Sequence, residues 1–161
     1  EALGPDAARF NIFRTLARQP ALLEAFLGWG RHVLTSPLDP ALRELAILRT
    51  GFRCRAGYEW MQHHRIGLAV GLSEAEIARV KQGAQAEGWS ERQRAVLAAT
   101  DALIDDHFLP DPLWHALDFL GDEGRVELVF AVGQYVMVSM ALNSLGIQPE
   151  DGAAVDPDLR A

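Results

Sequence analysis

The hydrophobic positions of this chain recur at the three- and four-residue spacing of amphipathic helices, and no segment shows the strict alternation of a strand. The pattern predicts helices from Pro5 to before Pro20, from Pro20 to about Leu34, over 43–55, over 58–70, up to Ala84, after Ser90, after Asp111, and from Asp122 to Leu145. The predicted fold class is therefore all-α, an orthogonal or antiparallel bundle of about eight helices.

Several short motifs mark where these helices begin. Asp39-Pro40 and Asp111-Pro112 each combine a capping carboxylate with a proline in the first turn. Ser73 and Glu76 have the spacing of a capping box, and Ser90 is a further N-cap. These motifs predict where the helices begin from the local sequence alone.

The last predicted helix contains the run LVFAVGQYVMVSMAL, residues 128–142, which is apolar on nearly every side. Such a helix is expected to be buried on several sides, at the centre of the domain or at a subunit interface. The run is shorter than the ~20 residues that span a bilayer, and Gln134, Tyr135 and Ser139 interrupt it. We therefore expect no membrane partner and a homo-oligomer: a dimer, trimer or hexamer.

Composition limits the class of protein. With 161 residues, 49% of them hydrophobic, the chain is predicted to form a single domain over 1–161, and its residues 148–161 form an acidic tail that is disordered or covers a partner. A net charge of −7 argues against nucleic acid as a partner. One cysteine excludes an internal disulfide framework. With no visible signal peptide, the predicted localisation is cytoplasmic.

Three titratable residues stand on the apolar faces of two consecutive predicted helices. Glu44 lies in one stripe with Leu48 and Gly51, while Glu59 and His63 stand four residues apart on the next helix. Two carboxylates and an imidazole at the apolar interior would suit proton transfer. The alternatives are structural: Glu44 paired with an arginine or a neighbouring subunit, and His63 a core histidine bonded to Glu59.

The stretch that holds these residues resembles the carboxymuconolactone decarboxylase and alkylhydroperoxidase D-like superfamily. The matching segments are RELAILRTG, YEWMQH, GLAVGLSEAEI and, downstream, VELVFAVGQYVMVSMALNSLGI, which together cover most of 41–147. The resemblance implies the alkylhydroperoxidase D-like helical fold. It also implies a small-molecule substrate and no cofactor.

The peroxidase branch of that superfamily has a Cys-x-x-Cys motif seven and four positions before the histidine. Those positions here hold Ala56 and Glu59, and Cys54 lies two residues before the first of them. The resemblance therefore implies a decarboxylase-like enzyme, in which His63 is the general acid and Glu44 and Glu59 orient it or act as a base. Peroxidase activity through Cys54 and a non-catalytic ligand-binding module are the alternatives.

Other candidates would bind the substrate. Arg49 could hold a substrate carboxylate, Tyr58 and Tyr135 offer phenolic donors, and Trp60 an apolar wall. The competing interpretation is core packing for the aromatic residues and solvation for the arginine. The histidines share no ligand spacing with a carboxylate or cysteine, so no metal site is predicted.

Overall fold

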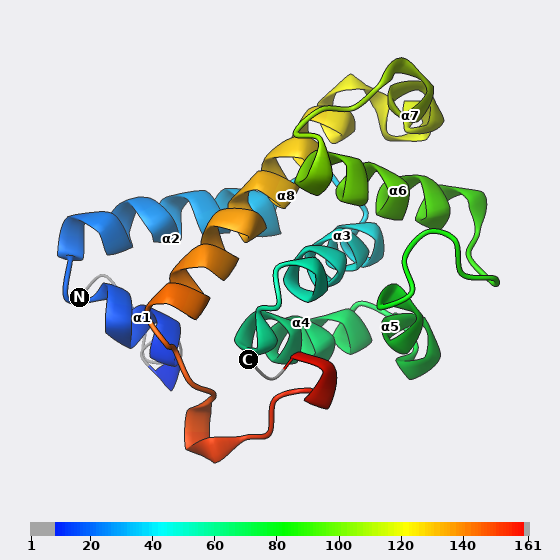
Figure 1. Ribbon diagram of the computed structural model, residues 1–161. Helices are drawn as coiled ribbons and strands as arrows, with labels where there is room; N and C mark the ends of the chain where they lie inside the picture. The colour runs from blue at the N-terminus through cyan, green and yellow to red at the C-terminus, as the bar shows by residue number, and fades with distance from the viewer. Residues whose placement is uncertain (1–8, 160–161) are drawn as a thin grey trace.

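The computed structural model describes residues 9–159, and in that range every regular element is a helix (Figure 1). The α-helices are α1 (Asn11–Leu16), α2 (Pro20–Leu34), α3 (Pro40–Arg53), α4 (Gly57–Ala69), α5 (Glu74–Val80), α6 (Glu91–Asp105), α7 (Asp111–Ala116) and α8 (Gly121–Ser144). Short 3-10 turns cover Asp118–Leu120, Glu150–Gly152 and Pro157–Leu159. The predicted all-α class and the eight α-helices are confirmed for the described residues, whereas the predicted start at Pro5 lies outside them.

Helix α3 is the centre of the bundle. It packs against α4, α5, α6 and α8, and these four helices surround it in Figure 1. All nine residues from Arg43 to Gly51 are buried, including three that carry formal charge: Arg43, Glu44 and Arg49. The polar groups of this helix therefore need partners inside the protein.

Most of the predicted helix starts are confirmed. The Asp39 carboxylate accepts a hydrogen bond from the Leu42 amide at 3.0 Å, and Ser73 and Ser90 both form complete capping boxes. The prediction for Asp111 was wrong in detail. Pro110 occupies the N-cap position and makes no side-chain cap, because Asp111 has already entered the helix.

Buried apolar residues form three clusters that meet around α3 and α8. One joins α3, α4, α5 and α6 and includes Leu48, Trp60 and Leu97. A second joins α3, α6 and α8, and a third joins α1, α2, α4 and α8. The site described below lies where α3, α4 and α8 meet.

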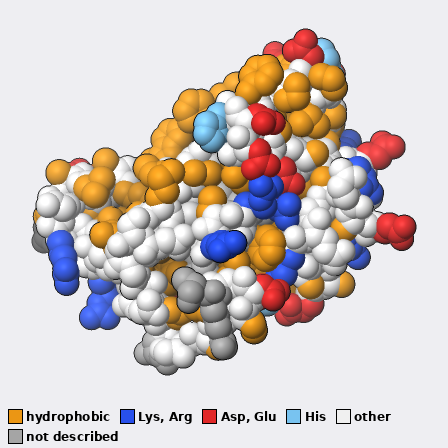
Figure 2. Space-filling view, viewed as in Figure 1, with side chains coloured by type: hydrophobic (Ala, Val, Ile, Leu, Met, Phe, Trp, Pro, Cys, Tyr) orange, Lys and Arg blue, Asp and Glu red, His pale blue; other side chains and the backbone are white. Residues whose placement is uncertain are grey.

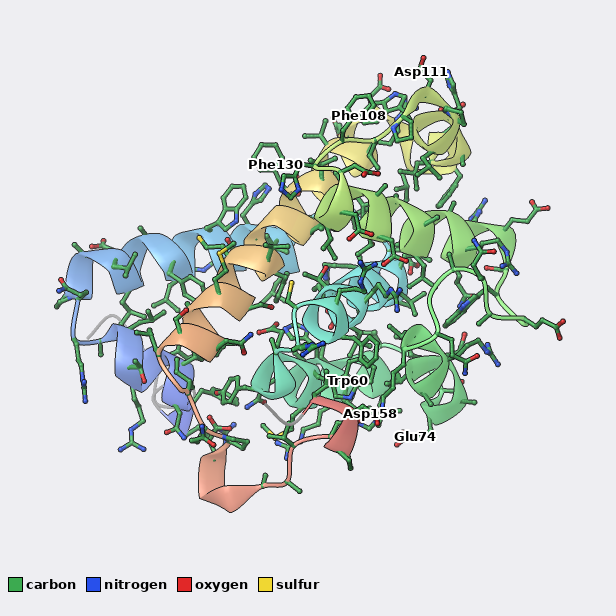
Figure 3. All side chains as sticks on the ribbon, in the orientation of Figure 1. Trp60, Glu74, Phe108, Asp111, Phe130 and Asp158 are labelled. Carbon is green, nitrogen blue, oxygen red and sulfur yellow. The ribbon has the colours of Figure 1, made fainter. Side chains whose placement is uncertain are left out.

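The C-terminal segment from Ile147 to Leu159 packs on its own chain, which contradicts the predicted disorder, while coverage of a partner stays a prediction. Leu159 is buried in the first cluster. Lys81 binds Asp156 and Asp158, and Asp158 lies near Trp60 in Figure 3. The segment also closes over the start of α4, where a Cβ on Gly57 would lie 2.1 Å from a Val155 methyl group.

One side of α8 remains apolar and exposed. Val126, Phe130, Met137 and Met140 are each about half exposed or more, and Figure 3 shows Phe130 pointing away from the bundle. Residues 118–144 are long and apolar enough to cross a membrane by length and composition, in contrast to the shorter run considered in the sequence. Core helices of soluble proteins meet the same criteria of length and composition, and 44% of the most apolar 18 residues of this helix are buried inside the protein.

Candidate active site

The connection between α3 and α4 places the candidate residues opposite one another. Only residues 54–56 separate the two helices, so the chain returns alongside itself. Gly51 faces Glu59, where a Cβ would lie 3.4 Å from the Glu59 Cγ, and Glu44, further back along α3, faces His63, further along α4. These pairings run in opposite directions along the two helices, so α3 and α4 form an antiparallel pair. Because Gly51 has no side chain, the Glu59 side chain has room to lie between α3 and α4.

Glu44, Glu59 and His63 form one buried group. The His63 Nδ1 lies 2.6 Å from the Glu44 Oε2, and its Nε2 lies 2.9 Å from the Glu59 Oε1. The first contact is a hydrogen bond, whereas the second has the distance of an ion pair without good alignment. Glu44 is fully buried, and the other two residues are less than 10% exposed. The three residues that the sequence placed on facing apolar surfaces are therefore in contact in the structure.

Arg43 completes the charge balance of this group. Its Nε lies 3.5 Å from the second oxygen of Glu44, and its Nη1 donates to the Leu34 carbonyl at 3.1 Å. Two formal positive charges, on Arg43 and His63, thus accompany two formal negative charges. An arginine within an apolar helical run was the sequence signal for this partner.

The pKa of His63 is strongly raised. Burial alone lowers it, but the carboxylates of Glu59 and Glu44 outweigh burial and raise the pKa to about 10. The imidazole is consequently protonated at neutral pH. A protonated ring has two N–H donors: Nδ1 is bonded to Glu44, so Nε2 is the group without a well-aligned partner.

Two carboxylate oxygens at this site have no hydrogen-bond partner among residues 9–159. They are the Glu44 Oε1 and the Glu59 Oε1, and both are buried. Buried polar atoms are nearly always paired in folded proteins, so such exceptions need an explanation. The lack of partners is explained if these carboxylates exchange a proton or bind a polar ligand.

Tyr135 of α8 covers the other side of His63. The two ring centroids are 4.8 Å apart, edge to face, and burial with the nearby Glu59 and Glu44 raises the pKa of Tyr135 well above its usual value. Its hydroxyl therefore remains protonated. Of the four predicted substrate-binding residues, it is the one in contact with this group.

The other three lie in different surroundings. Tyr58 donates to Glu150 at 2.5 Å, and Trp60 packs with Phe52 in the first core cluster. Arg49 binds both oxygens of Asp101 and donates to the carbonyls of Val80 and Lys81. These contacts favour structural roles over substrate binding, because the polar groups of Tyr58 and Arg49 are already occupied within the protein and the Trp60 ring is buried in the core.

Cys54 lies in the turn between α3 and α4 and is partly exposed. Its carbonyl accepts a hydrogen bond from the Asn143 side chain at 2.9 Å. Burial raises the pKa of its thiol, and this effect exceeds the lowering by Ser139 and Arg53. The thiol is therefore held away from the reactive thiolate form. No group of three or more His, Cys, Asp or Glu residues within the described range has an arrangement that would hold a metal ion.

The fold is shared with proteins of the alkylhydroperoxidase D type. A protein of unknown function from Agrobacterium tumefaciens, suggested to be an antioxidant defence protein AhpD, superposes with a TM-score of 0.78 at 21% identity, over 83% of this chain and 94% of that one. An uncharacterised peroxidase-related protein from Ralstonia eutropha gives 0.78 at 21% identity, over 91% and 82%. The debrominase Bmp8, as a cysteine-to-alanine variant with 2,3,4-tribromopyrrole, gives 0.75 at 15%, over 87% and 76%.

These likenesses confirm the predicted alkylhydroperoxidase D-like fold, and at such identities they show the fold alone. No curated protein matches the chain. A sequence model of the carboxymuconolactone decarboxylase family matches residues 20–102, which is more than half of the chain and includes Glu44, Glu59 and His63. The chain thus belongs to the carboxymuconolactone decarboxylase family.

Proposed function

We propose that this protein is a cofactor-free acid–base enzyme that decarboxylates a small carboxylated lactone or a related cyclic acid. The observation that carries the proposal is the buried imidazolium of His63 between Glu44 and Glu59. Its geometry provides a proton donor that is fixed in orientation and charged at neutral pH. Membership of the decarboxylase family supports the reaction class.

The reaction needs one proton, and His63 alone would supply it. Loss of CO2 breaks a carbon–carbon bond and leaves its electron pair on the ring as a dienolate. The His63 Nε2 then gives its proton to a carbon of that dienolate, while Glu44 holds Nδ1 and so fixes the ring. His63 takes a new proton from solvent at the end of the cycle. Glu59 stabilises the charged ring before transfer, since its carboxylate lies 2.9 Å from Nε2.

A pKa of about 10 suits this step. A histidine of ordinary pKa, about 6.5, would be mostly neutral at pH 7.5, so that only about a tenth of the molecules would hold the proton to be donated. His63 instead recovers its proton readily after each turnover, and a dienolate carbon is basic enough to accept it. Activity should therefore persist to higher pH than for an ordinary histidine and decline as the pH approaches 10.

The structure gives less support to peroxidase chemistry. The chain has one cysteine, so it cannot form the internal disulfide of a Cys-x-x-Cys enzyme. Burial disfavours the thiolate of Cys54, which is the form that attacks a peroxide. The debrominase among the structural neighbours was seen with a brominated pyrrole, a small ring, which is in keeping with a small cyclic ligand here.

The test is CO2 release from a panel of unsaturated lactone acids and related cyclic acids, run in D2O. We expect release with one deuterium in the product, and we expect His63→Gln to eliminate both. His64→Gln is the matched control, because His64 is adjacent but pairs with Glu74 at the surface. Equal turnover by His63→Gln would refute the proposed role. Binding without turnover by the wild type would make the protein a ligand-binding module.

We further propose that the protein acts as a homo-oligomer joined through the outer side of α8. Its exposed residues Val126, Phe130, Gly133, Met137 and Met140 alternate by four and three, which is the spacing of a helix that packs along another helix. In Figure 2 apolar side chains extend from α2 across α8. Light scattering at micromolar concentration should show an oligomer that Met137→Glu dissociates. A stable wild-type monomer would refute this assembly.

A further inference from the structure

The chain has two tyrosines, and their hydroxyl groups are in opposite situations. The Tyr58 hydroxyl donates to the Glu150 carboxylate at 2.5 Å. The Tyr135 hydroxyl makes no hydrogen bond with any residue in 9–159, although the side chain lies among packed helices and is only partly exposed. Enclosed tyrosine hydroxyls usually have a partner, so the hydroxyl of Tyr135 is available for a ligand.

The Tyr135 hydroxyl belongs to the surroundings of the acid–base group. Its ring centroid lies 4.8 Å from that of His63. The charges of Glu59, Glu44 and Arg43 all act on the phenol group, and burial together with the two carboxylates holds its pKa well above the usual value. The hydroxyl therefore stays protonated and uncharged over the pH range in which His63 is charged. The site thus combines a neutral donor with a charged proton source.

The charged donors next to Tyr135 already have assigned partners. The His63 Nδ1 bonds to Glu44 at 2.6 Å, and its Nε2 carries the proton of the proposed transfer to carbon. The Arg43 Nε lies 3.5 Å from the other Glu44 oxygen, and its Nη1 donates to the Leu34 carbonyl. Tyr135 is consequently the neutral donor in contact with His63 that has no partner among the described residues.

Decarboxylation as proposed above creates a negative charge that needs such a donor. When the carbon–carbon bond breaks, its electron pair enters the ring, and the negative charge moves to the ring carbonyl oxygen of the dienolate. A preorganised hydrogen-bond donor at this oxygen lowers the barrier, because its bond strengthens as the charge develops. A donor of high pKa suits this position, since it stabilises the oxygen without losing its own proton.

The surroundings of Tyr135 would strengthen this hydrogen bond. The ring packs against the third core cluster, as do Phe26, Leu27 and Met61. These apolar side chains lower the local dielectric, and a hydrogen bond to a developing charge is stronger where water is excluded. They also provide an apolar contact surface for the ring of a small lactone.

We propose that the Tyr135 hydroxyl donates a hydrogen bond to the carbonyl oxygen of the substrate ring and stabilises the dienolate that forms when CO2 leaves. The inference rests on the proposed decarboxylation for its reaction step, and it adds the group that binds the developing oxyanion. It also narrows the substrate class, because the bond that breaks must be able to pass its electrons to a ring carbonyl. His63 remains the proton donor to carbon, so no proton leaves Tyr135.

The kinetic test compares Tyr135→Phe with its matched control, Tyr58→Phe. Both variants keep the aromatic ring and lose one hydroxyl, but the Tyr58 hydroxyl is bonded to Glu150. Tyr135→Phe should lower kcat about a hundredfold, the usual cost of losing one oxyanion donor, with a much smaller change in KM. Each product molecule formed in D2O should still carry one deuterium, because His63 still donates. Tyr58→Phe should leave kcat close to the wild-type value.

A binding test separates this inference from the fate of the decarboxylation. Tetronate, the enolate anion of a small lactone ring, resembles the dienolate, whereas the unsubstituted butenolide has a similar ring without the anionic oxygen. Titration calorimetry of the wild type should show tighter binding of tetronate than of butenolide. Loss of a hydrogen bond to a charged oxygen in Tyr135→Phe should weaken tetronate binding at least about tenfold and butenolide binding much less. Tyr58→Phe should bind both as the wild type does.

Three outcomes would overturn the inference. The first is a wild-type kcat in Tyr135→Phe, which would leave the decarboxylation itself standing. The second is that the wild type binds tetronate no more tightly than butenolide, or binds neither at millimolar concentration. The third is an equal loss of tetronate binding in Tyr58→Phe, which would indicate a general loss of structure. If the wild type released no CO2 but bound tetronate through Tyr135, the oxyanion site would stand and the decarboxylation would fall.

Discussion

The chain offers a direct comparison between a buried and an exposed histidine–carboxylate pair on neighbouring residues. His63 lies 2.6 Å from Glu44 in the interior, and His64 lies 2.8 Å from Glu74 at the surface. Two double-mutant cycles therefore measure how much burial strengthens the same kind of contact. The variants are His63→Gln and Glu44→Gln with their double variant, and His64→Gln and Glu74→Gln with theirs.

The expected coupling differs several-fold between the two cycles. Breaking a buried ion pair by removing one partner costs about 3–5 kcal/mol, because the remaining charge is left uncompensated. Each interior single variant should lose that much, and the double variant should lose little more than either, so the coupling should be about 3 kcal/mol. For the surface pair, solvent screening limits the coupling to about 0–1 kcal/mol.

Urea unfolding at pH 5.5, about one unit below the ordinary pKa of histidine, is the assay. Unfolding midpoints with equal slopes would give the free energies of all seven proteins, the wild type and the six variants. An interior coupling no larger than that of the surface pair would refute the reasoning. It would mean that the Glu44–His63 contact does not carry opposite charges in the folded protein.

Three further predictions follow from the contacts described. The pKa of His63 is raised, so its contribution to stability is complete below pH ~6.5 and is lost as the pH rises toward about 10; the free energy of unfolding should fall over that range in the wild type and change less in His63→Gln. Cys54→Ser should leave decarboxylation unchanged and lower the melting temperature by only a few degrees, and hydroperoxide turnover lost in this variant would favour the peroxidase alternative. Gly57→Ala should displace the C-terminal segment, because the new methyl group would overlap Val155, and hydrogen exchange of the Leu159 amide should accelerate; Gly28→Ala, where a methyl group meets nothing within 4 Å, is the control.

Local sequence signals predicted the helices and one of the two carboxylate contacts of His63, the one with Glu59. Asp39, Ser73 and Ser90 act within three residues of themselves, so their caps could be recognised without knowledge of the fold. The Glu59–His63 pair follows from helical spacing in the same way. These predictions succeeded because the interacting groups belong to one turn of one helix.

The contacts that the sequence did not predict join residues far apart in the chain. Arg49 meets Asp101 across 52 residues, and Tyr58 meets Glu150 across 92. Nothing in the local pattern around Asp101 distinguishes it from a solvated surface carboxylate. The acidic composition of the tail suggested disorder, but Lys81 and the first core cluster provide partners for it. Only the packing of α3 against its neighbours creates these partners.

The burial of every residue from Arg43 to Gly51 in α3 also bears on how this family member can vary. An amphipathic helix tolerates substitutions on its exposed side, so tolerance along it rises and falls every three to four residues. From Arg43 to Gly51 no residue is exposed, so tolerance to substitution should be low at every position of this segment. Changes in this segment must be matched by simultaneous changes in α4, α6 or α8. Neutral drift should accordingly bypass α3 and accumulate on the outer sides of α2 and α5.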